Sequence, residues 1–201
     1  MVQTLKAERR NRIERASLEE FYQKGFENAS MREIAKKAQI STSNLYNYFE
    51  SKEELFYEIT DEIYQKINNL FFQLINAEKV VGVPKFFEQI TDRITKPIGE
   101  LIKKYRLEFL IILEKSQGSR YENYKEELVE VIEQHFIKDI QSKRDTQIKQ
   151  LTDTFIMHII ARNLLETLIE ISKHYKNDKW VDYNIDLFLK YHLNGIKQFF
   201  N

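Results

Sequence analysis

The chain has 201 residues and a formal net charge of zero, with no cysteine, five glycines and two prolines. The absence of cysteine excludes disulfides, thiolate metal ligands and a thiol nucleophile. The N-terminal segment is charged and lacks the apolar stretch of a signal peptide, and no run of ~18 apolar residues follows, so we expect a cytoplasmic protein outside the membrane. The scarcity of glycine and proline beside abundant Lys, Glu, Leu, Ile and Gln predicts an all-α fold.

Charge is distributed unevenly along this neutral chain. Residues 1–49 carry nine basic and six acidic residues, so the remainder is net acidic. The zero total argues against a protein that coats nucleic acid without specificity. The basic run from Lys6 to Arg15 is interleaved with Glu8 and Glu14. It is typical of a solvated helix face, and contact with nucleic-acid phosphates is the alternative.

The first elements in chain order are helical. Apolar spacing predicts one helix over residues 5–24, ended by Gly25. Ser30 and Glu33 have the spacing of a capping box, which predicts a short helix to about residue 38.

Two more helix starts follow closely. Ser41 can cap a second short helix through residue 48, and a second capping box at Ser51 predicts a long helix over residues 51–77. Three helices are therefore expected within the first fifty residues. We expect a three-helix N-terminal domain over residues 1–50 and a larger helical domain over residues 51–201.

Proline and glycine mark the predicted helix boundaries in the larger domain. Gly82 and Pro84 are expected to end the long helix and start the next, and Pro97 is expected to do the same again before a helix through Lys115. Helical periodicity then resumes over residues 121–142, 146–175 and 179–200. The total is about nine helices with no convincing strand.

The segment from Ser30 to Phe49 has the pattern of a helix-turn-helix. Two helices that cross steeply need a small residue at the crossing, here Ala35, and apolar residues to lock the pair. The locking positions are Ile34, Ala38, Ile40, Leu45 and Tyr48. Gln39 occupies the turn, where glycine is normally preferred, at a cost of about 1 kcal/mol if a left-handed conformation is kept.

The sequence S-M-R-E-I-A-K-K-A-Q-I-S-T-S-N-L-Y-N-Y-F-E-S-K-E-E-L-F resembles the N-terminal signature of the TetR/AcrR family of transcriptional regulators. Gln39 and Ser43 stand where the family commonly has glycine. The resemblance covers about residues 8 to 60; the rest of the chain is similar in length and helical layout. It implies an N-terminal helix-turn-helix DNA-binding domain and a C-terminal helical domain for ligand binding and dimerisation.

The resemblance also implies which residues contact DNA. Recognition-helix positions that face the major groove are matched by Thr42, Ser43, Asn44, Tyr46 and Asn47, of which Asn44 and Asn47 are the candidates for reading bases. Positions that hold backbone phosphate are matched by Tyr48, Lys52, Ser30 and Arg32.

For the C-terminal domain, the resemblance implies an apolar ligand pocket with a few polar groups. Candidate lining residues are Tyr105, Phe109, His135, His158, Arg162 and Glu166. His158, Arg162 and Glu166 share one helical stripe, and an Arg162–Glu166 salt bridge is the structural alternative to a pocket role. No metal is expected, because the four histidines lack paired ligand spacing, and no cofactor is expected.

The last two helices are apolar over a wider face than one core requires, which favours a homodimer through these helices. The expected function is a repressor that binds a palindromic double-stranded operator and is released by a small-molecule effector. The alternative is a helical small-molecule or partner-binding protein whose helix-turn-helix does not bind DNA. An enzyme is not expected, because the sequence contains no nucleophile elbow, phosphate loop or zinc motif.

Overall fold

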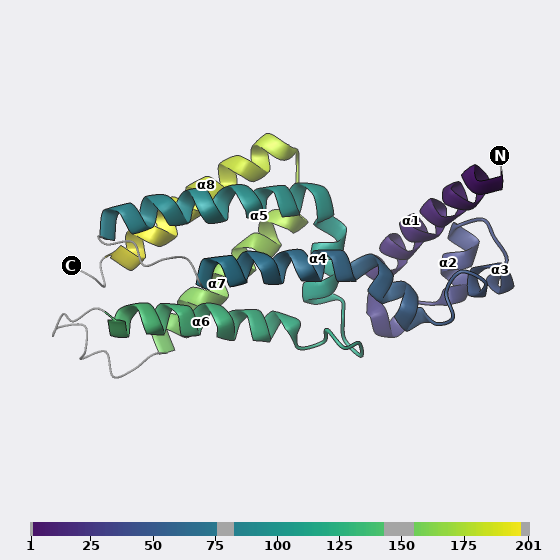
Figure 1. Ribbon diagram of the computed structural model, residues 1–201, viewed down its shortest axis with the longest axis horizontal. Helices are drawn as coiled ribbons and strands as arrows, with labels where there is room; N and C mark the ends of the chain where they lie inside the picture. Colours follow the sequence, from purple (N-terminus) through teal and green to yellow (C-terminus); the bar gives the residue numbers. More distant parts are fainter. Residues whose placement is uncertain (1, 76–82, 143–154, 198–201) are drawn as a thin grey trace. The chain divides into compact units, whose positions relative to one another are not determined.

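The structure is a computed structural model that describes residues 2–75, 83–142 and 155–197 (Figure 1). Over these ranges the chain is helical without strands, which confirms the all-α prediction. The eight helices are α1 (Val2–Asn28), α2 (Met31–Lys37), α3 (Thr42–Tyr46), α4 (Lys52–Ile75), α5 (Val83–Glu114), α6 (Tyr124–Ser142), α7 (Phe155–Lys173) and α8 (Asp178–Lys197).

The predicted helix breaks have different outcomes. Gly25 leaves the helical conformation with φ 74° and ψ 165°, so the expected break there is confirmed, although a last helical turn continues to Asn28. The break predicted at Pro97 is wrong, because α5 runs through it. The φ of proline is itself helical, so the chain continues at the loss of one backbone hydrogen bond. α5 becomes irregular only at Tyr105, with φ −124° and ψ 34°. The predicted start of a helix at residue 146 lies outside the described residues.

The chain divides into two compact units. The first comprises residues 1–66 and 105–125, and the second comprises residues 67–104 and 126–201. The first unit therefore contains the whole expected DNA-binding segment together with the start of α4 and the end of α5. A functional boundary at residue 50 stays a prediction.

Three phenylalanines form the aromatic core of the first unit. The ring of Phe56, on α4, packs edge-on against Phe21 at 5.0 Å and Phe26 at 4.8 Å between centroids. All three side chains are buried. The turn at Gly25 lets the Phe26 N–H donate to the carbonyl of Lys115 at 2.7 Å, beside the end of α5. α1 is thereby held to both α4 and the end of α5.

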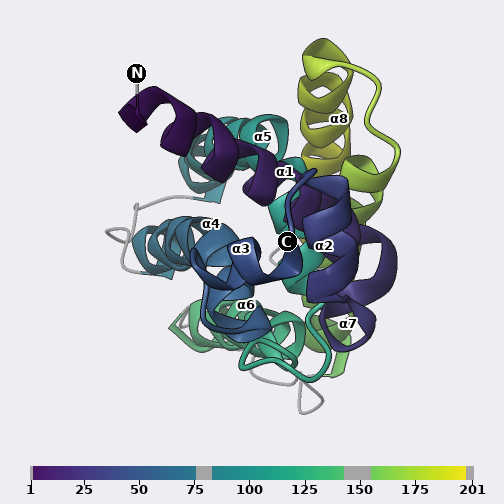
Figure 2. The ribbon, with the colours of Figure 1, turned by 90° about the vertical axis from the view of Figure 1, so that its right-hand side faces the viewer.

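α2 and α3 form the helix-turn-helix that the sequence predicted; Figure 2 turns this part toward the viewer. Between them, Gln39 has φ 56° and is the one non-glycine residue with positive φ in the described ranges. The Ile40 N–H donates to the Ala35 carbonyl at 3.0 Å and closes the turn. The left-handed turn is therefore kept without glycine, with the Gln39 side chain exposed to solvent.

The helix caps explain why the short helices begin where they do. Ser41 Oγ accepts the Asn44 N–H at 3.2 Å and caps α3, as predicted. Ser51 Oγ likewise accepts the Glu54 N–H at 3.0 Å at the start of α4. At α2 the predicted start is confirmed, but the predicted side-chain cap is wrong. Ser30 is extended and makes no side-chain cap bond; only its carbonyl accepts the first helical N–H.

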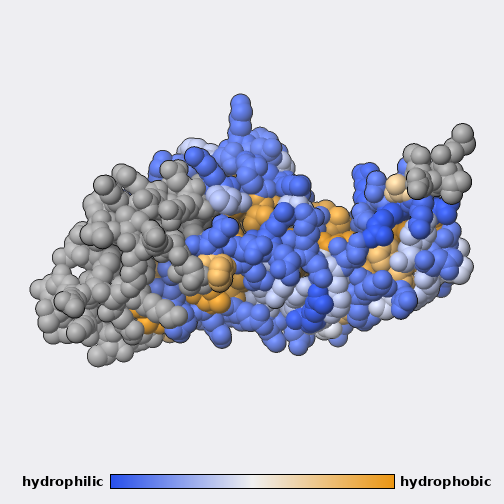
Figure 3. Space-filling view, viewed as in Figure 1, coloured by the Kyte–Doolittle hydropathy of each residue, from blue (hydrophilic) through white to orange (hydrophobic). Residues whose placement is uncertain are grey.

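The second unit packs α7 against α8, with apolar residues of both helices buried between them. Lys103 of α5 pairs with Asp182 of α8 at 2.9 Å. Gly99 lies close to the same aspartate, because a Cβ there would stand 3.1 Å from its Oδ1. α5 and α8 therefore approach closely at this point. Hydrophilic residues cover most of the described surface in Figure 3, with smaller apolar patches between them. No helix in the described ranges is both long and apolar enough to cross a membrane.

Replacing Gln39 by glycine should stabilise the protein by about 1 kcal/mol, because a left-handed L-residue is strained and glycine is not. Urea unfolding of the isolated protein measures this change. Lys36→Gly is the matched control, an exposed position within α2 where glycine should cost about 1 kcal/mol. Equal destabilisation by both substitutions would contradict the strain at residue 39.

The two serines before α2 and α3 should respond differently to alanine. Ser41→Ala removes a cap hydrogen bond and should lower the free energy of unfolding by about 1 kcal/mol. Ser30→Ala removes no such bond and should change it by only a few tenths. Thermal unfolding without DNA compares the pair, and a larger loss for Ser30→Ala would contradict the assignment.

Candidate nucleic-acid interface

α3 has a buried face and an exposed face. Leu45 is 0 % exposed and Phe49, just beyond the helix, is 2 % exposed. On α2 the facing residues Ile34, Ala35 and Ala38 are buried as well. The predicted locking positions Ile40 and Tyr48 are half-buried at the edge of this core. This apolar contact holds α3 against the rest of the unit, so its other side chains are free to meet a partner.

The nine predicted DNA-contact residues all reach the surface; none is buried. The exposed ones are Arg32, Ser43, Tyr46 and Asn47, and the half-buried ones are Ser30, Thr42, Asn44, Tyr48 and Lys52. Tyr46, with 47 % of its surface exposed, is one of the exposed large apolar side chains of the chain. Short polar groups and one aromatic ring therefore lie together on the outer side of α3, as an interface that reads bases requires.

Lys52 has a local role that the sequence did not reveal. Its Nζ donates to the carbonyl of Glu27 at 3.0 Å and lies 4.7 Å from the centroid of the Phe26 ring. The side chain thus ties the first turn of α4 to the end of α1. An ammonium group has three donors, so this bond leaves capacity for a phosphate oxygen.

Other basic residues of the first unit hold its helices together. Lys37 of α2 pairs with Glu20 of α1 at 3.0 Å, and this glutamate is 4 % exposed. Arg10 pairs with Glu14 at 3.0 Å and also with Glu58 of α4. Its guanidinium lies 5.5 Å from the centroid of the Phe49 ring. Part of the basic N-terminal segment is therefore structural, and a cation such as Arg32, exposed near the start of α2, is better placed to meet an external anion.

The six predicted pocket residues do not come from one compact unit. Tyr105 and Phe109 are buried in the first unit, where the Tyr105 hydroxyl donates to Glu62 of α4. The other four belong to the second unit. A pocket role for the six together stays a prediction.

Two of those four residues join α7 to α6, His158 through a hydrogen bond and Arg162 through an ion pair. His158 Nδ1 lies 3.0 Å from Glu133 of α6. Arg162 pairs with Glu126 of α6 and, at 3.7 Å, with Glu166 of its own helix. The salt bridge proposed as the structural alternative is therefore present.

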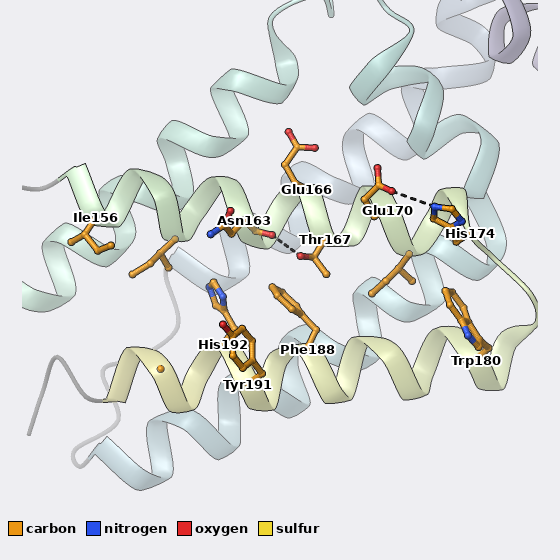
Figure 4. Close-up of a pocket in the computed structure, with 13 residues that line it drawn as sticks. Ile156, Asn163, Glu166, Thr167, Glu170, His174, Trp180, Phe188, Tyr191 and His192 are labelled. Carbon is orange, nitrogen blue, oxygen red and sulfur yellow. Dashed lines mark hydrogen bonds and ion pairs between the residues drawn. The ribbon is translucent and has the colours of Figure 1, made fainter.

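A groove of about 780 Å³ runs between α7 and α8 (Figure 4). The groove is lined by both apolar and polar side chains. Of the six predicted pocket residues, only Glu166 is among them. Its lining includes Ile156, Ile160, Asn163, Glu166, Thr167, Glu170, His174, Trp180, Phe188, Tyr191, His192 and Gly195. The sequence signalled the apolar breadth of these helices but not the groove itself, because the groove depends on how the two helices pack.

His192 is the unusual group in this groove. It points from α8 toward α7, is 9 % exposed and lies with its ring centroid 5.1 Å from that of Phe188. Its Nε2 is buried with no hydrogen-bond partner among the described residues. Burial lowers the pKa of His192 below its usual value, because the charged imidazolium loses hydration. Burial therefore favours the neutral form of the ring.

Comparison with known proteins places the helix-turn-helix in a family. Residues 13–59 match the family described as "Bacterial regulatory proteins, tetR family". A 68-residue stretch is 35 % identical to the "Uncharacterized HTH-type transcriptional regulator YdgC" of Bacillus subtilis (strain 168). That match spans 34 % of this chain and 35 % of the relative, so the chain matches only about a third of the relative's length.

The whole fold is similar to solved regulators. NalD of Pseudomonas aeruginosa, described as the secondary repressor of the MexAB-OprM multidrug efflux pump, has a TM-score of 0.55 and 16 % identity, covering 96 % of this chain and 97 % of that one. AibR, solved in complex with isovaleryl coenzyme A and operator DNA, has a TM-score of 0.57 and 16 % identity, covering 90 % and 97 %. The helix-turn-helix at residues 13–59 is therefore of the tetR type, and the chain shares the fold of these solved proteins over nearly its whole length.

Proposed function

We propose that this protein is a transcriptional repressor that binds a palindromic operator as a homodimer and is released by a small molecule bound in its C-terminal helices. The observation that supports DNA binding is that α3 has one buried face and one exposed face. Its apolar residues are buried against α2 and the core, while the nine predicted contact residues around it reach solvent. Such a helix can enter the major groove without disturbing its own packing.

Within that interface the side chains divide by chemistry. Asn44 and Asn47 carry amides, which can pair in bidentate fashion with adenine, and we assign them the reading of bases. Thr42, Ser43 and Tyr46 lie on the same surface and complete the groove contact.

The phosphate-binding group comprises Ser30, Arg32, Tyr48 and Lys52. Arg32 and Lys52 supply positive charge, and Ser30 and Tyr48 supply hydroxyl donors. Contacts of this kind set the position of the protein on the duplex without reading its sequence.

The homodimer is proposed to form through α7 and α8. Four large apolar side chains on these helices are more than half exposed in the single chain, namely Phe155, Tyr183, Leu187 and Tyr191. Burial against the same face of a second copy gives an interface with two-fold symmetry. Two α3 helices related by this symmetry would read half-sites roughly 34–36 Å apart, one helical turn of DNA.

The release by a ligand rests on continuity of the chain and on the solved relatives. α4 contributes residues to both compact units, so a rearrangement in the second unit has a direct covalent path to the helix that packs on α1. AibR was crystallised with both isovaleryl coenzyme A and operator DNA, so a protein of this fold can hold a small molecule and DNA. We assign no catalytic step to any residue.

Selection of DNA fragments from a random pool by the purified full-length protein tests the proposal. The expected result is a palindromic sequence bound by a dimer, with an affinity that falls when a cognate ligand from a small-molecule library is added. Failure to retain any fragment while the protein remains folded would reject DNA binding and favour a helical ligand-binding protein. Retention that no ligand alters would reject the release step alone.

Two alanine substitutions should separate base reading from phosphate binding. Asn44→Ala keeps the backbone N–H that Ser41 caps, so it should leave the fold intact and change base preference at one position by about tenfold. Arg32→Ala should weaken binding to all sequences alike and reduce the slope of log affinity against log salt by about one.

Titration of the selected operator and its single-base variants at several salt concentrations measures both effects. Gln23→Ala is a control at an exposed residue outside the nine positions, and it should alter neither. Equal losses on all sequences for both Asn44→Ala and Arg32→Ala would contradict the division of roles.

A further inference from the structure

The α5–α6 loop, residues 115–123, contacts the end of α1. The Lys115 carbonyl accepts the Phe26 N–H at 2.7 Å. Gly118 has φ 80°, a left-handed conformation that favours glycine. A Cβ built on Gly118 would stand 3.8 Å from the Cβ of Glu27 and 3.9 Å from the ring of Phe26. The loop therefore packs on the last turn of the helix that leads into the helix-turn-helix.

The same loop also contacts α4, through Arg120 and Tyr121. The backbone N–H of Arg120 donates to the Tyr57 hydroxyl at 3.1 Å, and its guanidinium donates to Asp61 Oδ1 at 2.5 Å. The guanidinium lies 3.9 Å from the centroid of the Tyr57 ring and 4.8 Å from that of the Tyr121 ring. The Tyr121 hydroxyl donates to the same Asp61 oxygen at 2.6 Å. A cation that meets two aromatic rings and a carboxylate at once is held in one orientation.

Tyr121 fixes the loop from its buried side. Its side chain is buried and stacks on the ring of Tyr64 of α4, with 4.6 Å between centroids. Its carbonyl accepts the Ser116 hydroxyl at 2.9 Å, which closes the loop on itself. Burial and the hydrogen bond to Asp61 raise the pKa of Tyr121 to about 12, so the hydroxyl remains a donor. The loop is therefore held in one conformation by its own bonds and by α4.

These contacts hold both ends of the helix-turn-helix. The chain enters the motif from α1 and leaves it into α4. The loop binds α1 at Phe26 and α4 at Tyr57 and Asp61. Residues 1–66 and 105–125 form one compact unit, so the loop belongs to the unit of the helix-turn-helix despite its distance along the chain. Both flanking helices are thus fixed to one element, which sets the direction in which the motif leaves them.

The Arg120–Asp61 pair is placed to orient helices more than to stabilise the fold. Its side chains are 50 % and 48 % exposed. Ion pairs at such exposure add little stability, because water screens the charges and ordering two side chains costs entropy. The apolar core of the unit, with Phe56 at its centre, is buried without this pair. Loss of the pair should therefore leave the protein folded and change how firmly α4 is joined to the loop.

We propose that Arg120 is a positioning residue for DNA binding, which fastens the α5–α6 loop to α4 and so fixes the direction of the helix-turn-helix. The inference rests on the proposed binding of a palindromic operator. One base pair between the half-sites changes their separation by about 3.4 Å and their rotation by about 35°. A motif held in one direction tolerates little of this change, whereas a motif released from the loop can follow it. Arg120 therefore governs the tolerance to half-site spacing and leaves base preference unchanged.

Binding of the full-length protein to its selected operator, and to versions with one central base pair added or removed, tests this role. The wild-type protein should lose affinity about tenfold or more on either altered spacing. Arg120→Ala should bind the selected operator about tenfold more weakly and lose less than about threefold further on altered spacing. An Arg120→Ala protein that keeps the wild-type ratio between spacings would overturn the proposal, because a smaller folded fraction lowers all affinities alike.

Two further variants control for the loop and for the partner of Arg120. Gln117→Ala changes an exposed side chain whose amide meets Glu122 of the same loop at 3.4 Å, and it should keep the wild-type spacing ratio. Asp61→Ala should reproduce the ratio of Arg120→Ala. The double variant should go no further, because the two residues act through one contact. Effects that add in the double variant would overturn the role of this pair.

Hydrogen exchange of the protein without DNA separates this inference from the proposed function. In Arg120→Ala, backbone amides at the end of α1 and in the first turns of α4 should exchange about tenfold faster, while those of α7 stay unchanged. Equal exchange in the variant and the wild type would overturn the proposal. A wild-type protein that retains no DNA, beside a variant with this faster exchange, would instead reject the proposed function and support the loop's hold on both helices.

Discussion

The packing of Phe56 against Phe21 and Phe26 is the interaction on which the presentation of α3 depends. It joins α4 to both sides of the turn at Gly25, and that turn places the Phe26 N–H against the Lys115 carbonyl. Aromatic pairs at these distances combine large apolar burial with a preferred edge-on geometry. α1 is therefore held at a defined orientation. Because α2 packs on α1, the position of the helix-turn-helix follows from this cluster.

α3 illustrates how a short element gains rigidity from its surroundings. Five residues are too few for a helix that is stable alone, since nucleation is costly and few backbone bonds repay it. Burial of Leu45 and Phe49, the Ser41 cap and the closed turn at Gln39 supply the missing stability. The polar residues on the outer face contribute little to this packing. Their chemistry can therefore serve recognition, and their positions are held by the buried face behind them.

Local sequence patterns predicted most of the fold and much of the candidate DNA interface. Apolar periodicity located the helices, and the Ser41 and Ser51 caps marked two helix starts, because these signals act within one or two turns. The same local reasoning failed at Pro97, where the helix tolerates proline, and at the Ser30 side chain, which does not reach its expected partner. The Arg162–Glu166 pair was predictable from its four-residue spacing.

The sequence by itself determined that this is an all-α protein with a tetR-type helix-turn-helix, because helical periodicity, capping residues and the motif are properties of neighbouring positions. Only the tertiary structure decided that Lys52 binds the Glu27 carbonyl and that Lys37 pairs with a buried Glu20. It also decided that a groove containing His192 lies between α7 and α8. Each of these features joins residues separated by at least one turn or loop, and their meeting depends on how whole helices pack, which no local pattern encodes.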